Sequence, residues 1–175
     1  MKAFLVGLFA GVVLVVLSVF GYFMSGSAPV ATSASQMPFE KFLAGKALHA
    51  KIAQEMPKSV PISADEANLL AGARVYRDTC AVCHGLPGQP ATAIAQGMFP
   101  KPPELLRGKG VTDDPAGETY WKVVNGIRLT GMPGFRQSLS DTQAWQVSVL
   151  LANADKLPSS VQAELSPSAP APSSK

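Results

Sequence analysis

Two cysteines and a histidine lie together in the run Cys-Ala-Val-Cys-His at residues 80–84. Cys80 and Cys83 are the only cysteines among the 175 residues. Two thiols at this spacing, followed at once by a histidine, form the C-x-x-C-H signature of covalent c-type haem attachment. In such a site each thiol adds to a vinyl group of the haem, and the histidine binds the iron. The run therefore predicts one covalent haem c, carried by Cys80, Cys83 and His84.

Three other uses of a C-x-x-C pair fit the rest of the sequence less well. A disulfide between the two cysteines closes so short a loop that it stabilises little, because the gain grows with loop length. A thioredoxin-like redox pair is expected at a strand-to-helix junction, and no strand pattern precedes Cys80. A zinc site needs four ligands, and His49 is the only further histidine or cysteine.

The N-terminus is an uncharged apolar stretch over residues 3–24. The apolar core of a secretory signal is about 7–15 residues long, whereas a membrane-spanning helix needs about 20. The length favours an uncleaved transmembrane anchor, with Lys2 left in the cytoplasm by the positive-inside tendency. A cleavable signal is the alternative, because small residues at 25–27 offer a cleavage site.

The positive charge of the chain does not indicate a nucleic-acid partner. The formal net charge is +3, yet residues 62–157 contain nine Lys and Arg against nine Asp and Glu. The excess of lysine lies mainly between residues 41 and 58, outside this neutral segment. A nucleic-acid footprint is expected to cluster on the folded face, so we expect no binding of nucleic acid.

The composition divides the chain into four parts. After the anchor (1–24) comes a linker (25–61), with a possible helix at 38–56 for which the helical wheel shows no apolar face. The folded domain is expected at 62–157. Residues 158–175 are rich in Ser, Pro and Ala and are expected to be disordered. A domain below 100 residues buries a marginal core, so we expect the haem to supply part of it.

The folded domain is expected to be all-α. A helix over residues 63–78, begun by a capping box of Ser63 and Glu66, leads directly to Cys80. Its predicted buried stripe follows helical spacing and consists of Leu69, Gly72, Ala73, Tyr76 and Cys80.

Two further helices are expected downstream. One begins at Asp114-Pro115, since proline suits the first turn, and ends before Gly126, since glycine is favoured just after a helix. The other is capped by Ser140 and Gln143.

A second axial ligand for the iron is expected from Met132. This methionine lies in a turn-rich segment (125–135) and is flanked by glycine and proline, which fix a loop. A core methionine that fills space is the simpler alternative. The other candidate ligands that we weigh are Met98, Met56 and His49.

Two further motifs follow the haem run. Residues 97–105 read Gly-Met-Phe-Pro-Lys-Pro-Pro-Glu-Leu, and residues 125–133 read Asn-Gly-Ile-Arg-Leu-Thr-Gly-Met-Pro. With the C-x-x-C-H run, these blocks make residues 64–151 resemble a class I c-type cytochrome of the bacterial single-haem group. The resemblance implies a small all-α fold around one haem, preceded here by a transmembrane helix. It also implies haem attachment on the periplasmic side of a bacterial inner membrane.

The resemblance also implies roles for individual residues. Cys80 and Cys83 carry the thioethers, and His84 and Met132 are the axial ligands. The carbonyl of Pro103 accepts a hydrogen bond from the proximal histidine, and Leu105 packs on the ring. Arg128 contacts a propionate or is a solvated surface charge. Gly72 and Tyr76 correspond to positions crossed by the C-terminal helix, facing Trp145 or Val149.

The function expected from these features is one-electron transfer rather than catalysis. A haem ligated by His84 and Met132 has no open site, so it changes oxidation state and little else. We expect a membrane-tethered carrier in a periplasmic respiratory chain. Its partners are expected to be redox donor and acceptor proteins of membrane respiratory complexes. Two alternatives stay open: a cytochrome subunit of a larger dehydrogenase or oxidase, and a five-coordinate haem sensor or enzyme.

Overall fold

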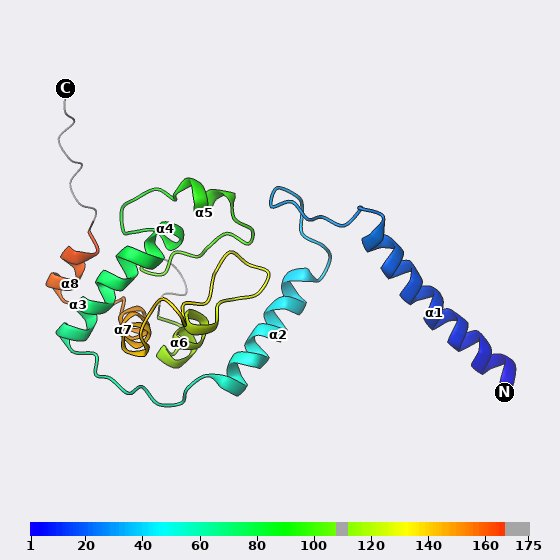
Figure 1. Ribbon diagram of the computed structural model, residues 1–175, viewed down its shortest axis with the longest axis horizontal. Helices are drawn as coiled ribbons and strands as arrows, with labels where there is room; N and C mark the ends of the chain where they lie inside the picture. Colours follow the sequence, from blue (N-terminus) through cyan, green and yellow to red (C-terminus); the bar gives the residue numbers. More distant parts are fainter. Residues whose placement is uncertain (108–111, 167–175) are drawn as a thin grey trace, which may run out of the picture. The chain divides into compact units, whose positions relative to one another are not determined.

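The computed structural model describes residues 1–107 and 112–166, and within them every regular element is helical and no strand forms (Figure 1). This confirms the all-α class. The chain divides into two compact units, Met1–Leu43 and Ala44–Lys175.

The first unit is built on α1 (Lys2–Met24), a helix of 23 residues with no buried side chain. At 1.5 Å per residue it is about 35 Å long, which matches the hydrocarbon thickness of a bilayer. Over an 18-residue window its mean hydropathy is 2.8, and it is the one helix in the described chain that is long and apolar enough to cross a membrane. It is therefore a candidate membrane anchor, although a signal sequence has the same properties.

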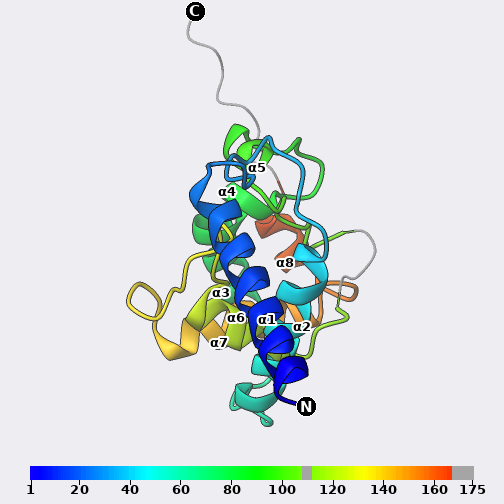
Figure 2. The same cartoon turned by 90° about the vertical axis from the view of Figure 1, so that its right-hand side faces the viewer.

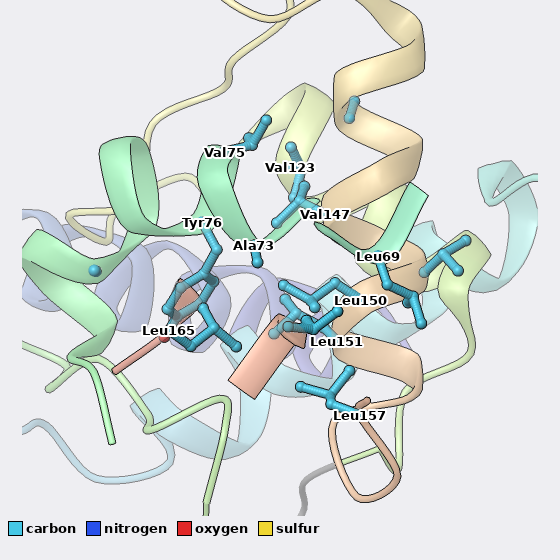
Figure 3. Packing of buried hydrophobic residues seen from close by; sticks show 14 of the residues in the cluster. Leu69, Ala73, Val75, Tyr76, Val123, Val147, Leu150, Leu151, Leu157 and Leu165 are labelled. Carbon is cyan, nitrogen blue, oxygen red and sulfur yellow. The ribbon is translucent and has the colours of Figure 1, made fainter. Parts of the chain in front are cut away.

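The core of the second unit is formed by α3 (Glu66–Val75), which packs across α7 (Asp141–Ala152), and by α6 (Ala116–Asn125), which packs on the same helix. The helices cross closely at Gly72, where a Cβ atom would lie 2.3 Å from the carbonyl oxygen of Gln146. Figure 3 shows the apolar side chains around this crossing. The predicted stripe on α3 is buried from Leu69 to Tyr76.

The residues that face Gly72 differ from those expected. The contacts are with Gln146 and the Cβ of Leu150, at 3.2 Å from the added Cβ, rather than with Trp145 or Val149. Trp145 lies on the side of α7 that faces α6, where its ring stacks on Tyr120 with centroids 4.1 Å apart.

Helix ends were predicted with mixed success. Ser140 and Gln143 form the expected capping box of α7, and α6 ends before Gly126, whose φ of 70° suits glycine. The capping box at Ser63 was wrong. Asp65 caps α3 instead and accepts from the backbone N–H of Asn68 at 2.9 Å, because a carboxylate is favoured by the positive end of the helix dipole.

The helix expected at 38–56 is present as α2 (Glu40–Glu55), and its C-terminal end has a buried face. Ile52 is buried, and Glu55 accepts a hydrogen bond from the indole N–H of Trp121 at 3.1 Å. A Cβ on Gly117 of α6 would lie 2.2 Å from the carbonyl oxygen of Pro57. Glu55 and Pro57 thus contact α6, which the helical wheel did not predict.

The segment after residue 158 begins with a helix, which corrects the expectation of disorder there. Helix α8 (Ser159–Glu164) packs on α3 (Figures 1 and 2). It buries Val161 and Leu165, and the carboxylate of Glu164 pairs with Arg77. Tertiary contact therefore orders a segment whose own composition is poor in apolar residues. The rest of the predicted tail, 167–175, lies outside the described residues.

Candidate haem site

The two cysteines and the histidine lie on two short turns that continue α3. A π-helical turn, η1 (Tyr76–Cys80), ends on the first cysteine, and α4 (Ala81–His84) carries the other two residues. Gly85 ends α4 with a φ of 75°, a conformation that favours glycine. The buried hydroxyl of Tyr76 donates to the carbonyl of Gly85 at 2.8 Å. This hydrogen bond ties the end of the Cys-His segment back to the helix that leads into it.

Both cysteines are free thiols, and each is half-buried. Burial, together with the nearby Cys83, raises the pKa of Cys80 to about 12. A thiol that stays protonated is a poor redox nucleophile, and a Cys80–Cys83 disulfide is not formed. Within residues 1–107 and 112–166, no cluster of three or more His, Cys, Asp or Glu residues has the arrangement of a metal site. The described geometry therefore gives no support to the disulfide, thioredoxin-like and zinc alternatives.

The histidine ring is oriented by a carbonyl from a distant segment. His84 Nδ1 lies 2.8 Å from the carbonyl oxygen of Pro103, which is the contact that the family resemblance implied. Because the carbonyl can only accept, Nδ1 carries the proton and Nε2 keeps its lone pair. Burial lowers the pKa of His84, and the hydrogen bond to Pro103 opposes this effect. A neutral imidazole with Nε2 available is the form that binds a metal.

Met132 lies on a loop that is closed by its own hydrogen bonds. The N–H of Ile127 donates to the carbonyl of Met132 at 3.1 Å, and the N–H of Met132 donates to Thr130 Oγ1 at 3.1 Å. Two glycines meet at the base of this loop, since a Cβ on Gly126 would lie 2.5 Å from the backbone nitrogen of Gly134. The loop therefore holds the methionine with backbone contacts on either side.

Three of the predicted site residues pack against one apolar cluster. Cys80, Leu105 and Met132 are each partly buried at the edge of the cluster that α3, α6 and α7 share. Arg128 is exposed on the loop before Met132. Of the other ligand candidates, His49 is exposed on α2 and Met56 is half-buried just after it.

Two contacts at the site were not predicted from the sequence. One is the hydrogen bond from Tyr76 to Gly85, and the other brings Met98 beside Gly131. A Cβ on Gly131 would lie 2.0 Å from the terminal methyl carbon of Met98 and 3.3 Å from its sulfur. The only signal in the sequence was the presence of Gly and Met in two separate loop motifs.

The donor set matches what a haem c requires. The chain offers two free thiols three residues apart, a neutral imidazole with one nitrogen available, and a thioether at the edge of the same apolar cluster. The residues that would hold the group are thus Cys80, Cys83, His84 and Met132.

Comparison with known proteins identifies the domain. A family model described as cytochrome c oxidase, cbb3-type, subunit III matches residues 67–151. This segment is a class I c-type cytochrome domain. Haem, iron and electron transport follow from that assignment, and the preceding helix α1 fits a membrane anchor.

A solved structure is also similar to part of this chain. It is the reducing HAO-like protein complex of Kuenenia stuttgartiensis, with 25% sequence identity and a TM-score of 0.47. The alignment covers 55% of this chain and 47% of that chain, so this chain spans about half the length of the relative. No curated protein matches this chain.

Proposed function

We propose that this protein is a membrane-tethered, one-electron carrier with a single covalent haem ligated by His84 and Met132. The observation that carries the proposal is the loop of Met132, which its own hydrogen bonds close at the edge of the cluster that also contacts Cys80. A bound haem supplies an iron that gains or loses one electron.

The chain's own residues would keep that chemistry restricted to electron exchange. Pro103 fixes the ring orientation of His84 and raises its basicity as a ligand through the Nδ1 hydrogen bond. The thioether of Met132, if bound to the haem iron, would favour its reduced state. With His84 and Met132 both bound to the iron, no site would be left for a substrate or gas. The carrier would exchange electrons through small, short-lived contacts, as is typical of redox partners.

We place the haem domain on the periplasmic side of a bacterial inner membrane, held by α1 as a single-pass anchor. The support is the length and apolarity of α1, together with the export that covalent haem attachment requires in this family. Tethering would keep the domain at a high local concentration near membrane partners. Its electron donor and acceptor would then be respiratory proteins of the same membrane.

The axial ligand is tested by replacing Met132 with alanine. The oxidised wild type should show the near-infrared sulfur-to-iron charge-transfer band and should resist carbon monoxide when reduced. Met132→Ala should lose the band, bind carbon monoxide and have a lower reduction potential, because water favours ferrous iron less than a thioether does. Met56→Ala is the matched control and should keep the band.

The covalent haem is tested separately by intact mass. The exported protein should carry the mass of one haem through acid–acetone extraction, and the mass of the bare polypeptide would overturn the proposal. If wild type binds carbon monoxide readily at neutral pH, the haem is five-coordinate and the protein is a sensor or an enzyme.

A second candidate function is a cytochrome subunit of a larger oxidoreductase. It is favoured by the family model, whose description names an oxidase subunit. Mild detergent extraction and size-exclusion chromatography distinguish the two. A free carrier elutes alone, whereas a subunit elutes with other polypeptides in fixed proportion.

A further inference from the structure

The thioether of Met98 connects the two segments that bear the axial ligands. Met98 follows α5 (Ala93–Gly97) and begins the segment that includes Pro103, the hydrogen-bond partner of His84. Gly131 directly precedes Met132. The terminal methyl and sulfur of Met98 occupy the space beside Gly131 where a side chain would project, at 2.0 and 3.3 Å from the position of a Cβ.

Gly131 has no evident backbone reason to be glycine. Its φ lies outside the left-handed range, unlike the φ of 70° at Gly126, so no left-handed backbone requires glycine there. What an alanine would meet is Met98. Because Gly131 has no side chain, Met98 can occupy the space beside it.

We infer that Met98 is a positioning residue, which holds the loop of Met132 against the segment that orients His84 and so slows dissociation of Met132 from the iron. The inference rests on the proposed ligation by Met132. The loop's own hydrogen bonds run within residues 127–132 and from Phe135 to Val123 of α6. Met98 adds a connection to the opposite ligand segment, so its loss frees the loop to move as a unit without unfolding it.

The rate of carbon monoxide binding to the reduced, full-length holoprotein measures this opening, because the gas enters only after Met132 leaves. Met98→Ala should keep the near-infrared band of the oxidised protein but bind carbon monoxide about tenfold faster, equivalent to about 1.4 kcal/mol. Met98→Leu, which restores most of the side-chain volume, should return the rate to within about threefold of wild type.

Gly131→Ala should remove the same contact in a different way, because its Cβ displaces the flexible end of Met98. This variant should also speed carbon monoxide binding, and in the Met98→Ala background it should add nothing further, as expected for two residues in contact. Gly97→Ala is the matched control. A Cβ there meets nothing within 4 Å, so the rate should not change.

The outcomes separate this inference from the proposed function. If wild type lacks the near-infrared band, Met132 is not a ligand, and both ideas fail. If wild type has the band and Met98→Ala binds carbon monoxide at the wild-type rate, only the role of Met98 is overturned. Fully additive effects of Met98→Ala and Gly131→Ala would also overturn it, because the two changes would then act through different contacts.

Discussion

The close crossing of α3 and α7 predicts that Gly72→Ala destabilises the domain. The new Cβ would lie 2.3 Å from the carbonyl oxygen of Gln146, whereas the closest ordinary carbon–oxygen contacts are about 3.3 Å. The helices must therefore separate by roughly 1 Å, since the oxygen that is struck belongs to the backbone of α7 and has no rotamer to change.

The size of the effect follows from two opposing contributions. Overpacking costs about 1–3 kcal/mol, and we take the upper end because the obstacle is backbone. Replacing glycine by alanine within a helix returns about 1 kcal/mol. The net loss is about 2 kcal/mol, which lowers the melting temperature of a domain of this size by about 8–16 °C.

Thermal unfolding of the full chain in detergent, followed by haem absorbance, measures this loss. Gly45→Ala in α2 is the matched control, because Gly45 is also a helical glycine and a Cβ there meets nothing within 4 Å. It should melt at or slightly above the wild-type temperature. If Gly72→Ala also melts at the wild-type temperature, the helices do not cross as closely as described.

Three further predictions concern α2, α6 and α1. Gly117→Ala places a Cβ 2.2 Å from the carbonyl oxygen of Pro57, so limited proteolysis should cut residues 52–62 faster than in wild type; equal cleavage would contradict the packing of this segment on α6. Burial lowers the pKa of Lys122, but its ion pairs with Asp114 and Glu118, at 2.5 and 2.9 Å, outweigh that effect and raise the pKa overall. A raised pKa stabilises the fold below the unfolded value of about 10.4, and this stabilisation is lost as the pH rises through the higher folded value. Lys122→Met should therefore cost about 1–3 kcal/mol at pH 8, and its gap from wild type in urea unfolding should narrow as the pH rises above the unfolded value; a gap independent of pH would refute the ion pairing. The full chain should remain in the membrane pellet after carbonate washing, and its release into the soluble fraction would show that α1 is cleaved.

Local signals in the sequence predicted the start of a helix correctly where one residue stood out as its N-cap. Ser140 is the one Ser, Thr or Asp near the start of α7 that has Glu or Gln three residues on, and with Gln143 it forms the cap. Before α3, by contrast, Ser63 and Asp65 are both suitable N-caps, and the choice depends on which lies at the point where the helix can pack on α7. The sequence pattern therefore gave the helix but placed its cap two residues early.

Long-range contacts were not accessible to the same reasoning. The segment from Ser159 looks disordered by composition, yet Val161 and Leu165 are both buried in the core cluster. Leu165 lies beside Tyr76 (Figure 3). The haem-binding residues were evident from the motif alone, since covalent attachment fixes both residue types and spacing. The contact of Met98 with Gly131 was not, because it joins residues 33 positions apart in two irregular loops.

The π-helical turn η1 has a consequence for how this protein tolerates change. The N–H of Ala81 bonds to the carbonyl of Tyr76, five residues back, so the turn contains one residue more than an α-helical turn. One residue corresponds to about 100° of rotation around a helix. Because of the extra residue, Cys83 and His84 project around the helix axis in a direction that is set independently of the direction of Leu69 and Gly72. Deleting one residue within η1 would keep the helix and its core face intact and point the haem-binding side chains in the wrong direction.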